Sequence, residues 1–90
     1  MKRASLEVTY RKGKPLAAYL CLPRRSGDKS VRTERPVQGL VVDYAADGRP
    51  IGIEIISPQK VNLRSLNRVL RAIRQSPLAR RDLAPLLAGE

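Results

Sequence analysis

The stretch that decides the fold runs from residue 39 to residue 56 and reads GLVVDYAADGRPIGIEII. Two runs of alternating apolar residues flank Asp47-Gly48, a dipeptide typical of two-residue hairpin loops in which both loop residues have positive φ. Such a loop pairs apolar residues with one another: Tyr44 with Ile51, Val42 with Ile53, and Leu40 with Ile55. A one-residue slip would place apolar side chains opposite polar ones. The stretch therefore predicts an antiparallel hairpin with one apolar face.

Three further segments predict strands around this hairpin. Leu6–Tyr10 alternates between apolar and polar residues, and Val31–Glu34 is consistent with a short edge strand. Leu16–Leu22 is apolar on both faces, which favours a central position in the sheet. Residues 11–14, with the sequence RKGK, form the turn between the first two strands.

Residues 62–75 have the periodicity of an amphipathic helix. The apolar residues of this segment fall within an arc of about 120° at 100° per residue, and they are Leu63, Leu66, Val69, Leu70 and Ile73. We expect this arc to lie on the apolar sheet face. The predicted fold class is α+β, a small antiparallel β-sheet covered on one face by a C-terminal amphipathic helix.

The residues after this helix carry weaker signals. Ser76-Pro77 predicts the start of a second, shorter helix, because proline is favoured at the first helical position. Pro85 then ends that helix near Ala84. The expected organisation is a single domain over residues 1–75, followed by a short helical or extended tail over residues 76–90.

The hairpin resembles that of a small bacterial family, the domain of unknown function 2283, which reads VVxDYDxDGRxVGIEIL. The resemblance covers about residues 5–57 and implies a strand-rich fold and a bacterial setting. The chain departs from the family in its basic first turn and in about thirty further residues. Some relatives look like the smaller member of a toxin–antitoxin-like pair. The matching residues are Val42, Asp43, Tyr44, Asp47, Gly48, Arg49, Gly52, Ile53, Glu54 and Ile55.

The composition argues against most catalytic chemistry. The 90 residues contain no histidine, which removes the usual general base and metal ligand. Cys21 is the only cysteine, so neither an intrachain disulfide nor a cysteine-rich zinc site can form. We therefore expect a protein that is not an enzyme and has no metal or cofactor. Without a run of about 20 apolar residues, we expect a cytoplasmic protein with no membrane segment.

Basic residues dominate the charge, with a formal net charge of +10. They can form a solvated surface, contact nucleic-acid phosphates, or bind an acidic protein. No helix-turn-helix spacing is evident, and no aromatic residue stands among the basic residues to stack on bases. The candidate contact residues are Arg24, Arg25, Arg32 and Arg35 in the connection 23–36, and Arg64, Arg68 and Arg71 on the polar side of the helix.

The second face of the hairpin is a candidate interaction face. Val41 and Ile56 make it partly apolar, which favours a homodimer or a small protein partner. Asp43 and Glu54 on the same face either keep it soluble or form a carboxylate pair for acid–base chemistry or metal binding. Gly52 allows another group to approach closely. The predicted function is a protein-interaction module, including an antitoxin-like role, and the alternative is a nucleic-acid-binding protein.

Overall fold

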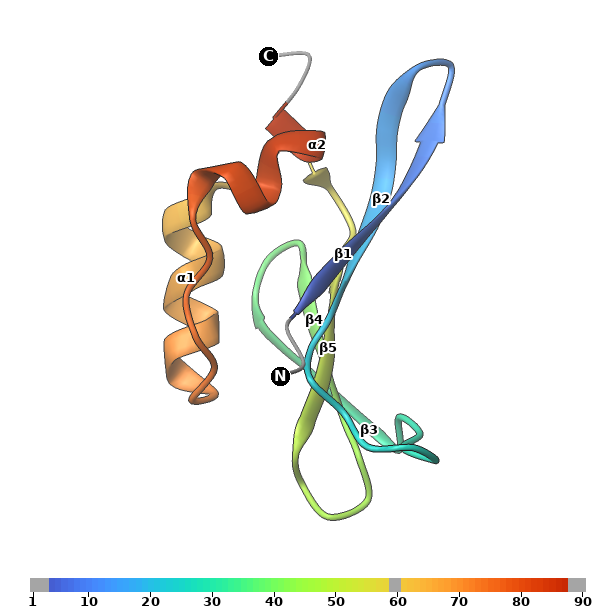
Figure 1. Cartoon of the computed structure of the whole chain (residues 1–90), viewed down its shortest axis with the longest axis vertical. Helices are drawn as coiled ribbons and strands as arrows, with labels where there is room; N and C mark the ends of the chain where they lie inside the picture. Colours follow the sequence, from blue (N-terminus) through green and yellow to red (C-terminus); the bar gives the residue numbers. More distant parts are fainter. Residues whose placement is uncertain (1–3, 59–60, 88–90) are drawn as a thin grey trace.

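The computed structural model describes residues 4–58 and 61–87 and has a small α+β fold. Its five strands form one antiparallel sheet in the order β1-β2-β5-β4-β3, and the helices α1 and α2 lie on the same side of it (Figure 1). The elements are β1 (Ser5–Arg11), β2 (Lys14–Cys21), β3 (Arg32–Val37), β4 (Leu40–Tyr44), β5 (Pro50–Ile55), α1 (Leu63–Ala72), the 3-10 helix η2 (Arg80–Leu83) and α2 (Ala84–Leu87).

The register of the β4–β5 hairpin matches the prediction away from the turn. Val42 pairs with Ile53 and Leu40 with Ile55, as the alternation of apolar residues indicates. At the turn end, however, Tyr44 pairs with Pro50 and not with Ile51. A register irregularity between Asp43 and Tyr44 absorbs the difference of one residue. The apolar faces thus determine the pairing in the body of the hairpin, and a bulge accommodates the loop.

The prediction of a two-residue Asp47-Gly48 loop is wrong. The Gly48 N–H donates to the Ala45 carbonyl at 2.9 Å, and the Ala45 N–H donates to the Arg49 carbonyl at 2.9 Å, so the loop has three residues. Gly48 has a φ of +90°, whereas Asp47 does not have positive φ. Loops of this length place a single residue in the left-handed region, and Gly48 occupies that position.

The turn with two positive φ values occurs in the other hairpin. Lys12 and Gly13 have φ values of 53° and 77°, and they connect the paired residues Arg11 and Lys14. This hairpin also contains an irregularity, because Thr9 pairs with Ala17 while the next residue of β1 pairs with Pro15. The tip of the β1–β2 hairpin projects beyond the other strands (Figure 1).

The core lies on one face of the sheet, which we call the inner face. It brings together Leu20, Leu40, Val42, Ile53 and Ile55 from the strands. Residues of α1 and η2 belong to the same buried cluster, and they are Leu66, Val69, Leu70 and Leu83. The buried positions of α1 fall on the predicted apolar arc.

Helix α1 is shorter than the predicted range 62–75. Asn62 caps its start, since the Asn62 side chain accepts a hydrogen bond from the Ser65 N–H at 2.8 Å. The helix ends at Ala72, and Arg74 then adopts a φ of 63°. The Gln75 N–H donates to the carbonyl of residue 70 at 2.8 Å, a bond that satisfies one free carbonyl at the helix end.

The prediction of a helix starting at Ser76-Pro77 is wrong. Residues 76–79 are not helical, and Asn67 of α1 holds this segment by bonding both backbone groups of Leu78, at 2.8 and 3.0 Å. Pro85 lies in the first turn of α2, where the missing proline N–H costs no helical hydrogen bond. Leu83 is only 2% exposed, so residues after 75 contribute to the same core.

We predict that Gly48→Val destabilises the protein by about 1–2 kcal/mol, because a β-branched residue resists the left-handed conformation. Chemical denaturation followed by circular dichroism measures the free energy of unfolding. Ala46→Val in the same loop is the matched control, since Ala46 is exposed and has negative φ. Equal losses in the two variants would contradict the assigned conformation of Gly48.

Candidate functional site

The face opposite the core, which we call the outer face, carries a polar contact that spans three strands. The Tyr19 hydroxyl on β2 donates to the Asp43 carboxylate on β4 at 2.9 Å. Strand β5 lies between them and presents Gly52 at the crossing point. A Cβ at residue 52 would overlap the Tyr19 hydroxyl and ring, so the tyrosine can cross β5 only because Gly52 has no side chain.

Arg24 joins the same contact from the connection after β2. Its guanidinium donates to the Ile51 carbonyl at 2.7 Å and to the Tyr19 hydroxyl at 3.4 Å. Burial, together with the hydrogen bond to Asp43, raises the pKa of Tyr19 to about 12. Tyr19 is therefore protonated at neutral pH and acts as a hydrogen-bond donor rather than as a base.

Cys21 lies beside this contact and is not activated for nucleophilic attack. Its thiol donates to the Glu7 carboxylate of β1 at 3.2 Å. Burial and this hydrogen bond raise the pKa of the Cys21 thiol, which lowers the fraction of thiolate. The pair connects β1 to β2 on the outer face.

The structure leaves only one of the two apolar residues of the predicted interaction face exposed. Val41 is buried within the chain at 6% exposure, whereas Ile56 is 40% exposed. Glu54 is exposed and pairs across the strands with Val41, while Asp43 pairs with Gly52. In the part of the chain that the structure describes, no three His, Cys, Asp or Glu residues come together as potential metal ligands.

The four candidate arginines of the connection 23–36 lie in different environments. Arg24 is engaged on the outer face, as described above. Arg32 forms an ion pair with Glu34 at 2.6 Å, and its guanidinium lies 4.1 Å from the centre of the Tyr44 ring. Arg25 and Arg35 are exposed.

Arg49 has a structural role that the sequence pattern does not reveal. Its guanidinium makes two hydrogen bonds to Asp28, at 2.7 and 3.1 Å, and one to Asp47 at 2.6 Å. These contacts fasten the connection after β2 to the β4–β5 loop, and they lower the pKa values of Asp28 and Asp47. The only sequence signal that could have indicated this role of Arg49 is that Asp47-Gly48-Arg49 matches the family pattern.

The arginines of α1 remain on the surface. Arg64, Arg68 and Arg71 are exposed and lie on the side of the helix opposite its buried residues. Within residues 4–58 and 61–87, none of the three side chains has an ion-pair or hydrogen-bond partner. We call these three residues the α1 arginine stripe.

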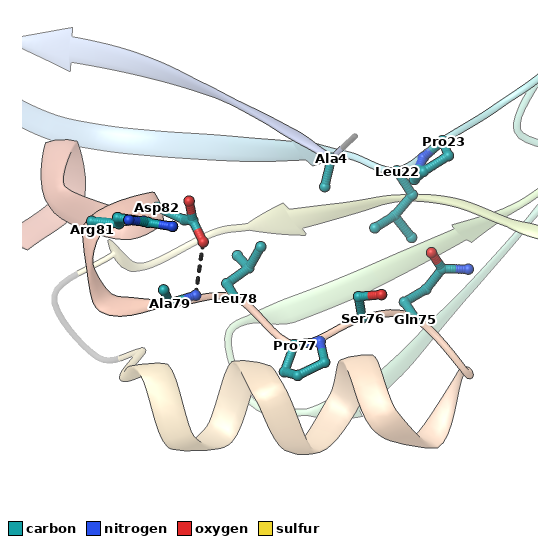
Figure 2. A pocket seen from close by; sticks show the side chains of 10 residues that line it. All are labelled: Ala4, Leu22, Pro23, Gln75, Ser76, Pro77, Leu78, Ala79, Arg81 and Asp82. Carbon is teal, nitrogen blue, oxygen red and sulfur yellow. Dashed lines mark hydrogen bonds between the residues drawn. The ribbon is translucent and has the colours of Figure 1, made fainter. Parts of the chain in front are cut away.

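A cavity of about 420 Å³ lies between the end of β2 and the segment 75–82. Figure 2 shows Leu22 and Leu78 facing one another across it. Asp82 at its rim accepts a hydrogen bond from the Ala79 N–H at 2.7 Å, so this carboxylate is already engaged. The lining mixes apolar and polar residues and contains no histidine or cysteine.

Comparison with known proteins returned no family model, no curated protein and no solved structure that matches the chain. The resemblance to the domain of unknown function 2283 therefore stays a prediction based on the hairpin residues. None of the helices in the described part of the chain is long and apolar enough to cross a membrane.

We predict that the free energy of unfolding falls as the pH rises from about 10 to about 12. The unfolded state loses the Tyr19 proton near the ordinary pKa of 10, whereas the folded state keeps it until about 12. The stabilisation is therefore complete below pH 10 and is lost through this window. Urea denaturation at several pH values measures it.

Tyr19→Phe is the control for this effect, because phenylalanine has no proton to lose. The fall in stability between pH 10 and 12 should be smaller in this variant. Asp43→Asn should lower the pKa of Tyr19, since the charged acceptor is removed. An unchanged pH profile in Tyr19→Phe would show that other groups cause the fall.

Proposed function

We propose that the protein is a non-enzymatic protein-interaction module that binds an acidic partner protein through the α1 arginine stripe. The observation that carries this proposal is that Arg64, Arg68 and Arg71 are exposed and unpaired in the described part of the chain. The helix spaces them by about 6 Å and about 4.5 Å along its axis. Such a row matches carboxylates on a partner surface, because arginine forms two-pronged hydrogen bonds with carboxylates.

The distribution of acidic residues supports this proposal. Residues 61–87 contain six arginines and a single acidic residue, Asp82. Five of the six acidic residues in residues 4–58 are engaged by other groups, and the sixth, Glu54, is exposed. The five are Glu7 with Cys21, Asp43 with Tyr19, Glu34 with Arg32, and Asp28 and Asp47 with Arg49. The positive charge of the C-terminal part is therefore left for an external partner to neutralise.

The orientation of α1 also supports an outward-facing stripe. We propose that α1 covers part of the inner face, because Leu66, Val69 and Leu70 share the buried cluster with strand residues. Side chains on the opposite side of the helix then point to solvent. The stripe is thus held on a helix whose position is set by its buried side.

The non-enzymatic part of the proposal rests on the state of the titratable groups. The chain has no histidine. The pKa of the Cys21 thiol is raised and that of Tyr19 is about 12, so neither is prepared to act as a nucleophile or base at neutral pH. An antitoxin-like role, with a toxin protein as the acidic partner, would be one form of this function.

Nucleic-acid binding is the second candidate, and the same unpaired arginines favour it. Nucleic-acid phosphates would neutralise the positive charge of the stripe just as effectively as protein carboxylates. The protein reading is preferred because the three tyrosines lie on β1, β2 and β4, so α1 offers no aromatic ring on which a base can stack.

We predict that replacing Arg64, Arg68 and Arg71 together by Gln abolishes capture of the partner protein. The triple variant should keep its stability within about 0.5 kcal/mol, because the three side chains are exposed. Affinity purification from the organism that makes the protein, followed by mass spectrometry, measures capture. The matched control replaces Lys12, Lys14 and Lys29 by Gln, which removes the same charge from other exposed positions.

Nuclease treatment separates the two candidate functions. A protein partner should be captured by the unmodified chain and by the lysine control after nuclease treatment, but not by the arginine variant. If capture depends on nucleic acid, binding to duplex DNA should weaken steeply with salt, and the arginine variant should reduce that slope by up to about three units. That result, or equal capture by both variants, would contradict the acidic-protein proposal.

A further inference from the structure

The two edge strands of the sheet differ in how they are protected against pairing with another chain. Strand β3 contains Pro36, an irregularity between Glu34 and Val37, and several charged residues. Proline, bulges and charges are the features by which proteins block an exposed sheet edge. The β3 edge is therefore a poor template for a further strand.

Strand β1 contains no proline and no extra bulge residue, and only two of its residues are charged. It runs for seven residues, Ser5–Arg11, without proline. The irregularity of its hairpin falls on β2, where Leu16 is the extra residue between the partners of Thr9 and Tyr10. The described structure pairs β1 with β2 and with no other strand. One edge of β1 is thus a continuous row of backbone groups available for pairing.

The charges on β1 are self-complementary. Glu7 and Arg11 lie on the outer face, two residues to either side of Thr9, and all three are exposed. In an antiparallel pair of β1 strands related by a two-fold axis at Thr9, Glu7 of each copy stands opposite Arg11 of the other. Residues that face one another in this way have Cβ atoms about 4.5–5.5 Å apart, close enough for ion pairs.

The apolar residues of β1 match in the same register. Val8 of each copy stands opposite Tyr10 of the other on the inner face. Tyr10 is 53% exposed in the single chain, with its hydroxyl donating to the Pro85 carbonyl at 3.4 Å, and Leu16 on the same hairpin is 51% exposed. Pairing would give the exposed Tyr10 ring an aliphatic neighbour, a favourable cross-strand combination.

We propose that the protein forms a homodimer in which the β1 strands pair antiparallel about a two-fold axis at Thr9, so that the two sheets become one continuous sheet. Other registers are less favourable. A pairing centred on Val8 places Glu7 opposite Thr9, and one centred on Glu7 places the two Glu7 carboxylates opposite each other. The dimer uses a sheet edge and not α1, so it goes beyond the proposed function and stands or fails independently of it.

The dimer should be weak. A single pair of short strands buries less than the roughly 1,200–2,000 Å² typical of stable complexes. Each copy also carries a net charge of +10, although salt at about 0.1 M screens charges beyond about 10 Å. We therefore expect a dissociation constant in the range of about 10 μM to 1 mM, which analytical ultracentrifugation can measure.

Charge reversal tests the pairing. Glu7→Arg alone places arginine opposite arginine, and Arg11→Glu alone places glutamate opposite glutamate, so each variant should dimerise at least about tenfold more weakly. An equimolar mixture of the two variants restores both ion pairs and should recover the original dimer affinity. Both side chains are exposed, so we expect each variant to fold, and circular dichroism checks this.

Cysteine cross-linking tests the register directly. In a Cys21→Ser background, Thr9→Cys places the two thiols beside the two-fold axis and should give a disulfide-linked dimer on mild oxidation. Ser5→Cys is the control, because its two copies would be about 26 Å apart in this register, eight residues along a strand. A monomer at about 1 mM, failure of the mixture to recover affinity, or equal cross-linking at residues 5 and 9 would overturn the proposal.

Discussion

The pairing of β2 with β5 is the constraint on which the rest of the structure depends, because it joins the N-terminal hairpin to the other three strands. It places Leu20 opposite Ile53 and Ala18 opposite Ile55, so the apolar row of the inner face continues across the sheet. The partners are more than thirty residues apart, and closing so long a loop costs entropy that burial of these side chains must offset.

The same pairing organises the outer face. With β5 between β2 and β4, a tyrosine on one strand can reach a carboxylate on the other, provided that the residue between them is glycine. Asp43 is then part of an internal contact, and Val41 is buried. The outer face is therefore partly filled by contacts within the chain, and the two contacts proposed above use the solvent side of α1 and the edge of β1 instead.

The charges divide along the chain in a way that has a physical consequence. Most acidic residues of the loops and the outer face have partners within the chain, and Arg49 is the partner of two of them. The C-terminal part keeps its arginines without such partners among the described residues. The proposed binding of an acidic partner rests on this uneven distribution, because an excess of one charge attracts the opposite charge and accelerates association.

The sequence by itself determined where the strands lie and which side of the helix is buried. It also determined which side chains within the segments 40–44 and 51–55 share a face. Local periodicity is sufficient for these predictions, because the spacing of apolar residues shows which side chains are buried together on one face. It also indicated a close approach at Gly52. Only the tertiary structure decided that Tyr19 makes that approach, that Arg24 and Arg49 are engaged internally, and that Gly48 alone takes positive φ in its loop. The first two outcomes depend on strand order and on contacts between separate segments of the chain, which no local pattern specifies. The third follows from the register of the hairpin, in which Ala45 and not Ala46 bonds Arg49 and closes a three-residue loop.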